Sequence, residues 1–170
     1  MLYINIIMKG YLIMIDLISL VKECSPHVAP ETMLTIIRTE SSGNHLVVND
    51  NTTKTSYKPK TKEEAVNLSY VLIKNGHNLD FGLTQINLIN AKKFKLTLNK
   101  IFDPCENIKH GAKIFTQAFL NASKVTNNEQ YALLKAFSTY NTGNPHKGFK
   151  NGYVNKIIEN ASKIKVSDIE

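Results

Sequence analysis

The chain has 170 residues, of which 42% are hydrophobic and 21% are charged, and its formal net charge is +7. This length predicts one domain with a single hydrophobic core. The positive charge favours an anionic partner, but the lysines are scattered and no nucleic-acid-binding motif accompanies them, so we expect no nucleic-acid partner. The absence of tryptophan excludes an indole platform for stacking a sugar or a base.

The first 21 residues are strongly apolar, but Asp16 interrupts the run and no Ala-x-Ala cleavage site follows it. An aspartate at this position argues against a stable membrane span, and the run is an imperfect secretory signal. We expect residues 1–12 to be a signal, a tether or an additional segment, with the export route left open. The domain itself is predicted over 13–162, followed by a polar tail over 163–170.

A helix is predicted over residues 30–41, and it organises the rest of the chain. Its i, i+3, i+4 and i+7 positions share one face and are occupied by Met33, Ile36, Ile37 and Glu40. Gly43 is a stop signal for this helix. Burial of the face raises the pKa of Glu40, which is the property that a general acid requires. The alternative is an exposed glutamate that pairs with a neighbouring basic residue.

The other expected elements follow from periodicity and from capping signals. Thr61 with Glu64, and Asp103 with Pro104, mark the starts of two helices. The predicted elements are a helix over 13–24, a hairpin or long loop over 46–57, a helix over 61–74, a short strand or extended turn over 79–87, a short helix over 88–94, helices over 103–121 and 128–140, a loop over 141–150 and a helix over 152–164. The predicted fold class is mainly α (α+β), with six or seven helices and a small β-hairpin element.

Two cysteines, Cys24 and Cys105, bear on redox state and metal binding. Neither belongs to a C-x-x-C pair, and the five histidines lack metal-ligand spacing, so we expect no metal site. The cysteines are compatible with one disulfide in an oxidising compartment or with two buried thiols in the cytosol. A disulfide would close a loop of about 80 residues and contribute on the order of 4 kcal/mol in the chain-entropy treatment.

Five short motifs occur in order along the chain. They read Cys-x-Pro-x-Val-x-Pro at 24–30, Arg-Thr-Glu-Ser-x-Gly-Asn at 38–44, Gly-Leu-x-Gln-Ile-Asn at 82–87, Phe-Asp-Pro-Cys at 102–105 and Tyr-Asn-Thr-Gly at 140–143. Together they resemble the soluble lytic transglycosylase family, and most closely its small members from bacterial type IV secretion systems. The resemblance covers about residues 13–158. It implies a lysozyme-like fold and cleavage of peptidoglycan.

The resemblance also implies roles for individual residues. Glu40 would protonate the oxygen between N-acetylmuramic acid and N-acetylglucosamine and then, as a carboxylate, accept the proton of the muramoyl 6-hydroxyl. The product would be a 1,6-anhydro sugar, formed without added water or a cofactor. The supporting or substrate-binding residues would be Ser41 beside Glu40, Tyr140 orienting Glu40, Gln85 on the substrate, and Asn87 and Asn141 lining the cleft.

Asp80 introduces a second interpretation. The run 80–87 also resembles the segment of animal lysozymes whose aspartate is the second catalytic carboxylate. Glu40 and Asp80 would then be a hydrolytic muramidase pair, of phage origin for example, and the separation of the two carboxyl groups would decide. Otherwise Asp80 is a turn residue that bonds to nearby backbone amides. A third interpretation is a non-catalytic, wall-binding assembly scaffold that keeps the fold.

The resemblance favours a disulfide between Cys24 and Cys105, because both occupy positions typical of the subgroup and its substrate lies in the periplasm. It further implies a periplasmic location. The implied partners are the glycan strands of peptidoglycan and the proteins of a type IV secretion apparatus.

Overall fold

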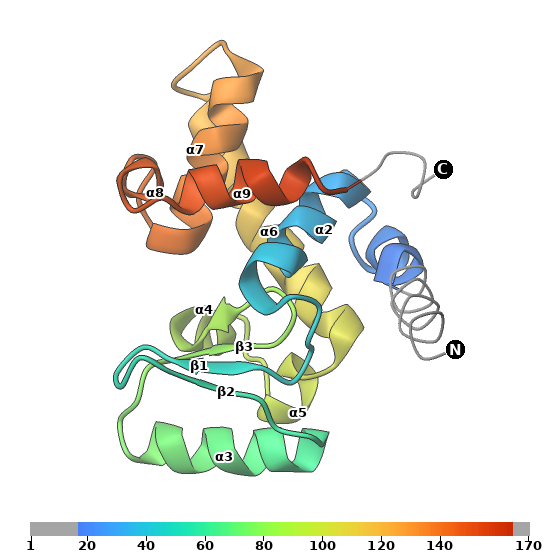
Figure 1. Ribbon diagram of the computed structural model, residues 1–170, viewed down its shortest axis with the longest axis vertical. Helices are drawn as coiled ribbons and strands as arrows, with labels where there is room; N and C mark the ends of the chain where they lie inside the picture. Colours follow the sequence, from blue (N-terminus) through green and yellow to red (C-terminus); the bar gives the residue numbers. More distant parts are fainter. Residues whose placement is uncertain (1–16, 165–170) are drawn as a thin grey trace, which may run out of the picture.

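The computed structural model describes residues 17–164. The expected segment 1–12 and residues 165–170 of the expected tail lie outside the described residues. Figure 1 shows a group of helices at one end of the long axis and a small sheet with further helices at the other.

The helical part begins with residues 17–24, which are helical. Its other members are α2 (Pro30–Ser41), α6 (Pro104–Ser123), α7 (Glu129–Thr142), α8 (Lys147–Lys150) and α9 (Tyr153–Ala161). Helix α9 packs on α2 and α7, and in Figure 1 α2 runs toward the sheet.

The sheet part holds four antiparallel strands in the order β2-β1-β3-β4. The strands are β1 (Val48–Asp50), β2 (Thr55–Tyr57), β3 (Leu79–Phe81) and β4 (Ile86–Asn87), and the accompanying helices are α3 (Lys62–Lys74), α4 (Leu88–Lys93) and α5 (Leu98–Ile101). Helix α3 lies along the end of the molecule, beneath β1 and β2 (Figure 1).

The predicted fold class is confirmed, since the described residues are mainly helical with a small antiparallel sheet. The predicted hairpin forms between β1 and β2, with its turn at 51–54. Asn49 and Asp50 belong to β1, where they pair with Ser56 and Thr55. The two four-residue helices α5 and α8 are too short to leave a periodic apolar signal and were not predicted.

Within residues 17–164, buried apolar side chains form two clusters rather than the single core predicted. One cluster lies among the helices and includes Met33, Ile36, Ile37, Ile108 and Phe137. The other lies between the sheet, α3 and α5, and includes Val48, Leu79, Phe81, Ile86 and Phe102. The segment that follows β3 connects the two clusters, because Phe81 belongs to the second and Leu83 to the first.

Asn107 of α6 is the polar centre of this junction. Its amide nitrogen donates to the carbonyl oxygens of Phe81 and Ile101, each at 2.9 Å. Its amide oxygen accepts from the backbone nitrogen of Thr84 at 2.9 Å and from the Thr84 hydroxyl at 2.8 Å. The side chain is buried, so it supplies hydrogen-bond partners to groups that water cannot reach.

We therefore expect Asn107→Ala to lower the free energy of unfolding by about 2–3 kcal/mol, because it leaves buried donors and acceptors unpaired. Urea denaturation measures the change. The control is Asn155→Ala on the exposed surface of α9, for which we expect a change within about 0.5 kcal/mol. Equal effects of the two substitutions would contradict the assignment of Asn107 as a structural centre.

Cys24 and Cys105 form a disulfide, with their Cα atoms 5.3 Å apart. The bond joins the helical residues 17–24 to the first turn of α6. The predicted pairing is confirmed.

Candidate active site

Glu40 lies in the last turn of α2. The three apolar residues of its face, Met33, Ile36 and Ile37, are completely buried, as predicted. The helix ends because Ser42 and Gly43 adopt left-handed backbone conformations, with φ of 54° and 84°. The helix therefore carries the Glu40 carboxyl to the junction between the helices and the sheet.

Burial raises the pKa of Glu40 from its ordinary value of 4.5 to about 7. A hydrogen bond from Tyr153 opposes this shift, and the negative charge of Asp80 adds to it. The ammonium of Lys156 lowers the pKa, and it also donates to the carbonyl oxygen of Thr39, the residue before Glu40, at 3.0 Å. A pKa near 7 leaves both forms of the carboxyl populated at neutral pH, as a group that gives and takes one proton requires.

Tyr153 makes the direct contact with this carboxyl, because its hydroxyl donates to Oε1 of Glu40 at 2.5 Å. Tyr153 is the first residue of α9 and is buried. The sequence prediction gave the orienting role to Tyr140 and missed Tyr153. The signal that identifies it is the spacing of Tyr153, Val154 and Ile157, which form the buried face of α9 and place a polar-tipped ring at its start.

Tyr140 has a different hydrogen-bond partner from the one expected. Its hydroxyl donates to the carbonyl oxygen of Thr84 at 2.6 Å, so it fastens the segment after β3 to α7. Burial and the negative charge of Glu40 both raise the pKa of Tyr140, which keeps this hydroxyl protonated. The observed hydrogen bond of Tyr140 holds the neighbouring turn, and its role in orienting Glu40 stays a prediction.

Ser41 joins the end of α2 to the segment after β3, and Gln85 joins that segment to the residue before β1. The Ser41 hydroxyl donates to the carbonyl oxygen of Leu83 at 2.8 Å. Gln85 has a left-handed backbone, with φ of 51°, and its amide nitrogen donates to the carbonyl oxygens of Gly82 at 2.9 Å and Val47 at 3.3 Å. Its amide oxygen is buried and has no hydrogen-bond partner among the described residues, which leaves an acceptor for a ligand.

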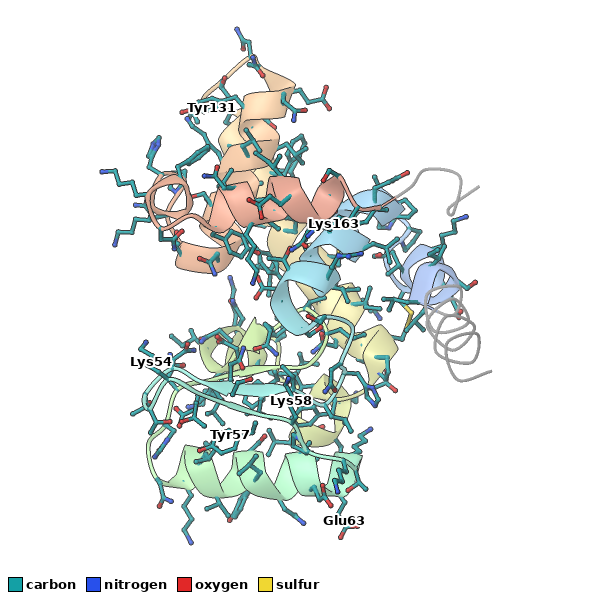
Figure 2. All side chains as sticks on the ribbon, in the orientation of Figure 1. Lys54, Tyr57, Lys58, Glu63, Tyr131 and Lys163 are labelled. Carbon is teal, nitrogen blue, oxygen red and sulfur yellow. A yellow bond between two sulfur atoms is a disulfide. The ribbon has the colours of Figure 1, made fainter. Side chains whose placement is uncertain are left out.

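Asp80 lies within β3, not in a turn, and it bonds to side-chain amides rather than to backbone amides. Its two carboxylate oxygens accept from Asn51 at 2.8 Å and from Asn87 at 2.7 Å. Burial raises the pKa of Asp80, whereas the two amides and the charge of Lys54 lower it. Lys54 lies at the tip of the β1–β2 hairpin (Figure 2). The turn interpretation of Asp80 was therefore wrong.

Asn87 and Asn141, the remaining predicted site residues, both form hydrogen bonds within the protein. The amide oxygen of Asn87 accepts from the backbone nitrogen of Ile89 at 3.0 Å and so caps α4, in addition to the bond with Asp80. Asn141 is exposed, and its amide oxygen accepts from Asn151 at 3.2 Å. The structure thus brings Glu40, Ser41, Gln85, Asp80 and Tyr140 to one junction, with Asn87 supporting Asp80.

Comparison with known proteins decides the family. The transglycosylase SLT domain matches residues 18–162. The chain belongs to this family. The family resemblance read from the motifs is confirmed, and with it the lysozyme-like fold class.

Two relatives of this SLT-domain chain are both named virB1. The type IV secretion system protein virB1 of Brucella suis biovar 1 is 34% identical over 154 residues, which cover 87% of this chain and 65% of that protein. Protein virB1 of Agrobacterium fabrum is 34% identical over 143 residues, covering 84% of this chain and 58% of the relative. The chain thus spans less than two thirds of the length of these curated relatives. No solved structure matches it.

Two further features of the SLT-domain chain concern metals and membranes. Among residues 17–164, no group of three or more histidine, cysteine, aspartate or glutamate side chains is arranged to hold a metal ion. Over the same range, no helix is long and apolar enough to cross a membrane.

Tyr153→Phe is expected to move the pH dependence of activity toward alkaline pH. The hydrogen bond from Tyr153 favours the carboxylate form of Glu40, so its removal raises the pKa of Glu40 above about 7. The measurement is the pH at which kcat/KM falls to half its maximum. Tyr140→Phe is the matched control, since it removes a hydroxyl bonded to Thr84 instead. An alkaline shift in both variants, or in neither, would contradict the assignment of Tyr153.

Proposed function

We propose that this chain is a peptidoglycan lytic transglycosylase that cleaves the β-1,4 bond between N-acetylmuramic acid and N-acetylglucosamine. The observation that supports this most directly is the partly buried carboxyl of Glu40, which has a pKa of about 7 and lies with its Oε1 2.5 Å from the Tyr153 hydroxyl. It lies in an SLT domain, at the end of a helix packed against the rest of the fold.

The proposed reaction needs one carboxyl acting twice. Protonated Glu40 gives its proton to the glycosidic oxygen while the bond from that oxygen to C1 of the muramoyl residue breaks, and N-acetylglucosamine leaves with a new hydroxyl. The Glu40 carboxylate then takes the proton of the muramoyl 6-hydroxyl as that oxygen bonds to C1. The carboxyl is restored, no water is consumed, and the product is a 1,6-anhydro sugar.

The surroundings of Glu40 support this double use. The Tyr153 hydroxyl and the nearby charge of Lys156 favour the carboxylate that exists between the two steps, while burial favours the acid that begins the first step. The unpartnered amide oxygen of Gln85 is available to accept from a sugar hydroxyl or acetamido group.

A hydrolytic muramidase is the second candidate, because the negative charge of Asp80 acts on Glu40. In that reaction the second carboxylate attacks the sugar or activates water. Both oxygens of Asp80 already accept hydrogen bonds from Asn51 and Asn87. This arrangement favours an electrostatic role for Asp80 over a direct one.

The identity of the released product tests the proposal. Purified cell-wall sacculi are digested with the wild type and with Glu40→Gln, and the released muropeptides are analysed by mass spectrometry. We expect anhydromuropeptides from the wild type alone. Muropeptides with free reducing ends from the wild type would establish the hydrolase instead, and would make Asp80→Asn the next variant to measure.

We further propose that the enzyme acts in the bacterial periplasm and opens the wall locally for the assembly of a type IV secretion system. The names of the virB1 relatives support the secretion setting, and the Cys24–Cys105 disulfide supports an oxidising compartment. In a strain that lacks this gene, we expect the wild type but not Glu40→Gln to restore secretion. Restoration by both would favour the scaffold interpretation.

A further inference from the structure

A pocket of about 290 Å³ opens beside Tyr140, between α4, α6 and α7. Helix α4 and its C-cap contribute one wall and α6 contributes another, while Tyr140 and Thr139 of α7 close the inner side. The lining residues that bear on its chemistry are Asn90, Lys93, Phe94, Lys113, Gln117 and Tyr140. Its volume is close to the lower end of the range of small-ligand sites, about 300–1,000 Å³.

The lining is cationic and rich in amides. Lys93 and Lys113 face it from two different helices, and no carboxylate is among its lining residues. The ring of Phe94 packs against His110 with the ring centroids 5.0 Å apart, which holds one wall in place. Such a site suits a ligand that combines amide groups with negative charge.

Tyr140 links the pocket to the candidate active site. The same side chain lines the pocket and donates to the carbonyl oxygen of Thr84 at 2.6 Å. Thr84 directly precedes Gln85, and Ser41 bonds to Leu83 in the same segment. A ligand in the pocket therefore contacts Tyr140, the side chain that is bonded to the segment near Glu40.

We propose that this pocket binds the peptide stem of the glycan strand through the carboxylates of the stem. The inference rests on the proposed function. The stem is attached to the muramoyl residue, the sugar whose C1 would react, so it leaves the strand close to Glu40. It is a chain of amides with free carboxylates, which matches the lysines and amides of the lining. The pocket holds part of a stem and distinguishes peptide-bearing strands from stripped ones.

The first test compares two substrates, intact glycan strands and strands from which an amidase has removed the stems. The pocket variant is Lys93→Gln with Lys113→Gln. The control is Lys92→Gln with Lys124→Gln, which gives the same change in net charge. Both lysines are exposed and neither lines the pocket. We expect the preference of the wild type for intact strands, as a ratio of kcat/KM values, to fall about three- to tenfold in the pocket variant alone.

A second test does not depend on turnover. Glu40→Gln, with and without the two pocket substitutions, is titrated with peptide-bearing and with stripped glycan oligomers in a calorimeter. We expect tighter binding of the peptide-bearing oligomer only while Lys93 and Lys113 are present. Equal binding of both oligomers, or an equal loss for both in the pocket variant, would overturn the inference in favour of a glycan-binding pocket. Failure of the wild type to cut either strand, with the binding difference intact, would overturn the proposed function alone.

Discussion

Glu40→Gln is expected to slow the release of muropeptides by a factor of about 10²–10⁴, the usual contribution of a general acid–base group. Glutamine has the shape of glutamate, and its amide oxygen still accepts from Tyr153, but it has no acidic proton to give to the glycosidic oxygen. The measurement is the initial rate on purified sacculi at pH 6, where most of the wild-type carboxyl is protonated.

The control is Glu159→Gln, on the exposed surface of α9, which we expect to retain the wild-type rate. The wild type should also lose activity as the pH rises through about 7, because the proton that starts the reaction is then absent from Glu40. A rate for Glu40→Gln within a few fold of the wild type, or a pH profile that stays level from 5 to 9, would show that another group supplies the proton.

Removal of the disulfide is expected to have the largest effect on stability. Cys24 and Cys105 are 81 residues apart in the sequence, and in the chain-entropy treatment a cross-link over such a loop contributes about 4 kcal/mol. We expect the double variant Cys24→Ser, Cys105→Ser to lose about that much free energy of unfolding. The Tm should fall by roughly 8–16 °C, given 2–4 °C per kcal/mol for a chain of this length.

Urea denaturation and calorimetry of the double variant, beside the oxidised wild type, measure the loss. The wild type kept in a reductant is the matched comparison, because it loses the bond without any change of side chain, and it should resemble the double variant. A loss below 1 kcal/mol would mean that packing between residues 17–24 and the start of α6 holds this region without the bond.

Local signals predicted those parts of the fold that depend on neighbouring residues. The hydroxyl of Thr61 accepts from the backbone nitrogen of Glu64 at 3.1 Å, and Asp103 accepts from Glu106 at 3.0 Å, as their helix-start signals indicated. The face of α2 that carries Glu40 was also visible, because spacing along one helix determines it.

Contacts between distant segments could not be predicted in this way. β1 pairs with β3, so Val48 lies opposite Phe81. Helix α3 lies between these strands in the sequence, so no local pattern predicts their pairing. Within α3, the apolar Val71 is 53% exposed, whereas the polar Ser69 is buried. The Ser69 hydroxyl donates to the carbonyl oxygen of Ala65 at 2.6 Å, which satisfies it inside the core.

The hydrogen-bond partner of Glu40, Tyr140 or Tyr153, also depends on contacts between distant segments. Each tyrosine lies at one end of a helix with a buried ring and a polar tip, so the sequence alone makes both suitable partners for Glu40. Only the packing of α9 on α2 places Tyr153 on the carboxyl. Asp80 likewise obtains one of its amide partners, Asn51, from beyond the neighbouring strand.

The elevated pKa of Glu40 also makes one contribution to stability depend on pH. In the unfolded chain Glu40 loses its proton near pH 4.5, but in the folded chain it does so only near 7. Between these values the native state holds the extra proton, so the free energy of unfolding falls as the pH rises, by about 3 kcal/mol in total. Glu40→Gln removes this dependence and should be the more stable protein at pH 8. The fold is therefore more stable when Glu40, the proposed catalytic group, is protonated. Mildly acidic pH would favour both the catalytic activity and the stability of the protein.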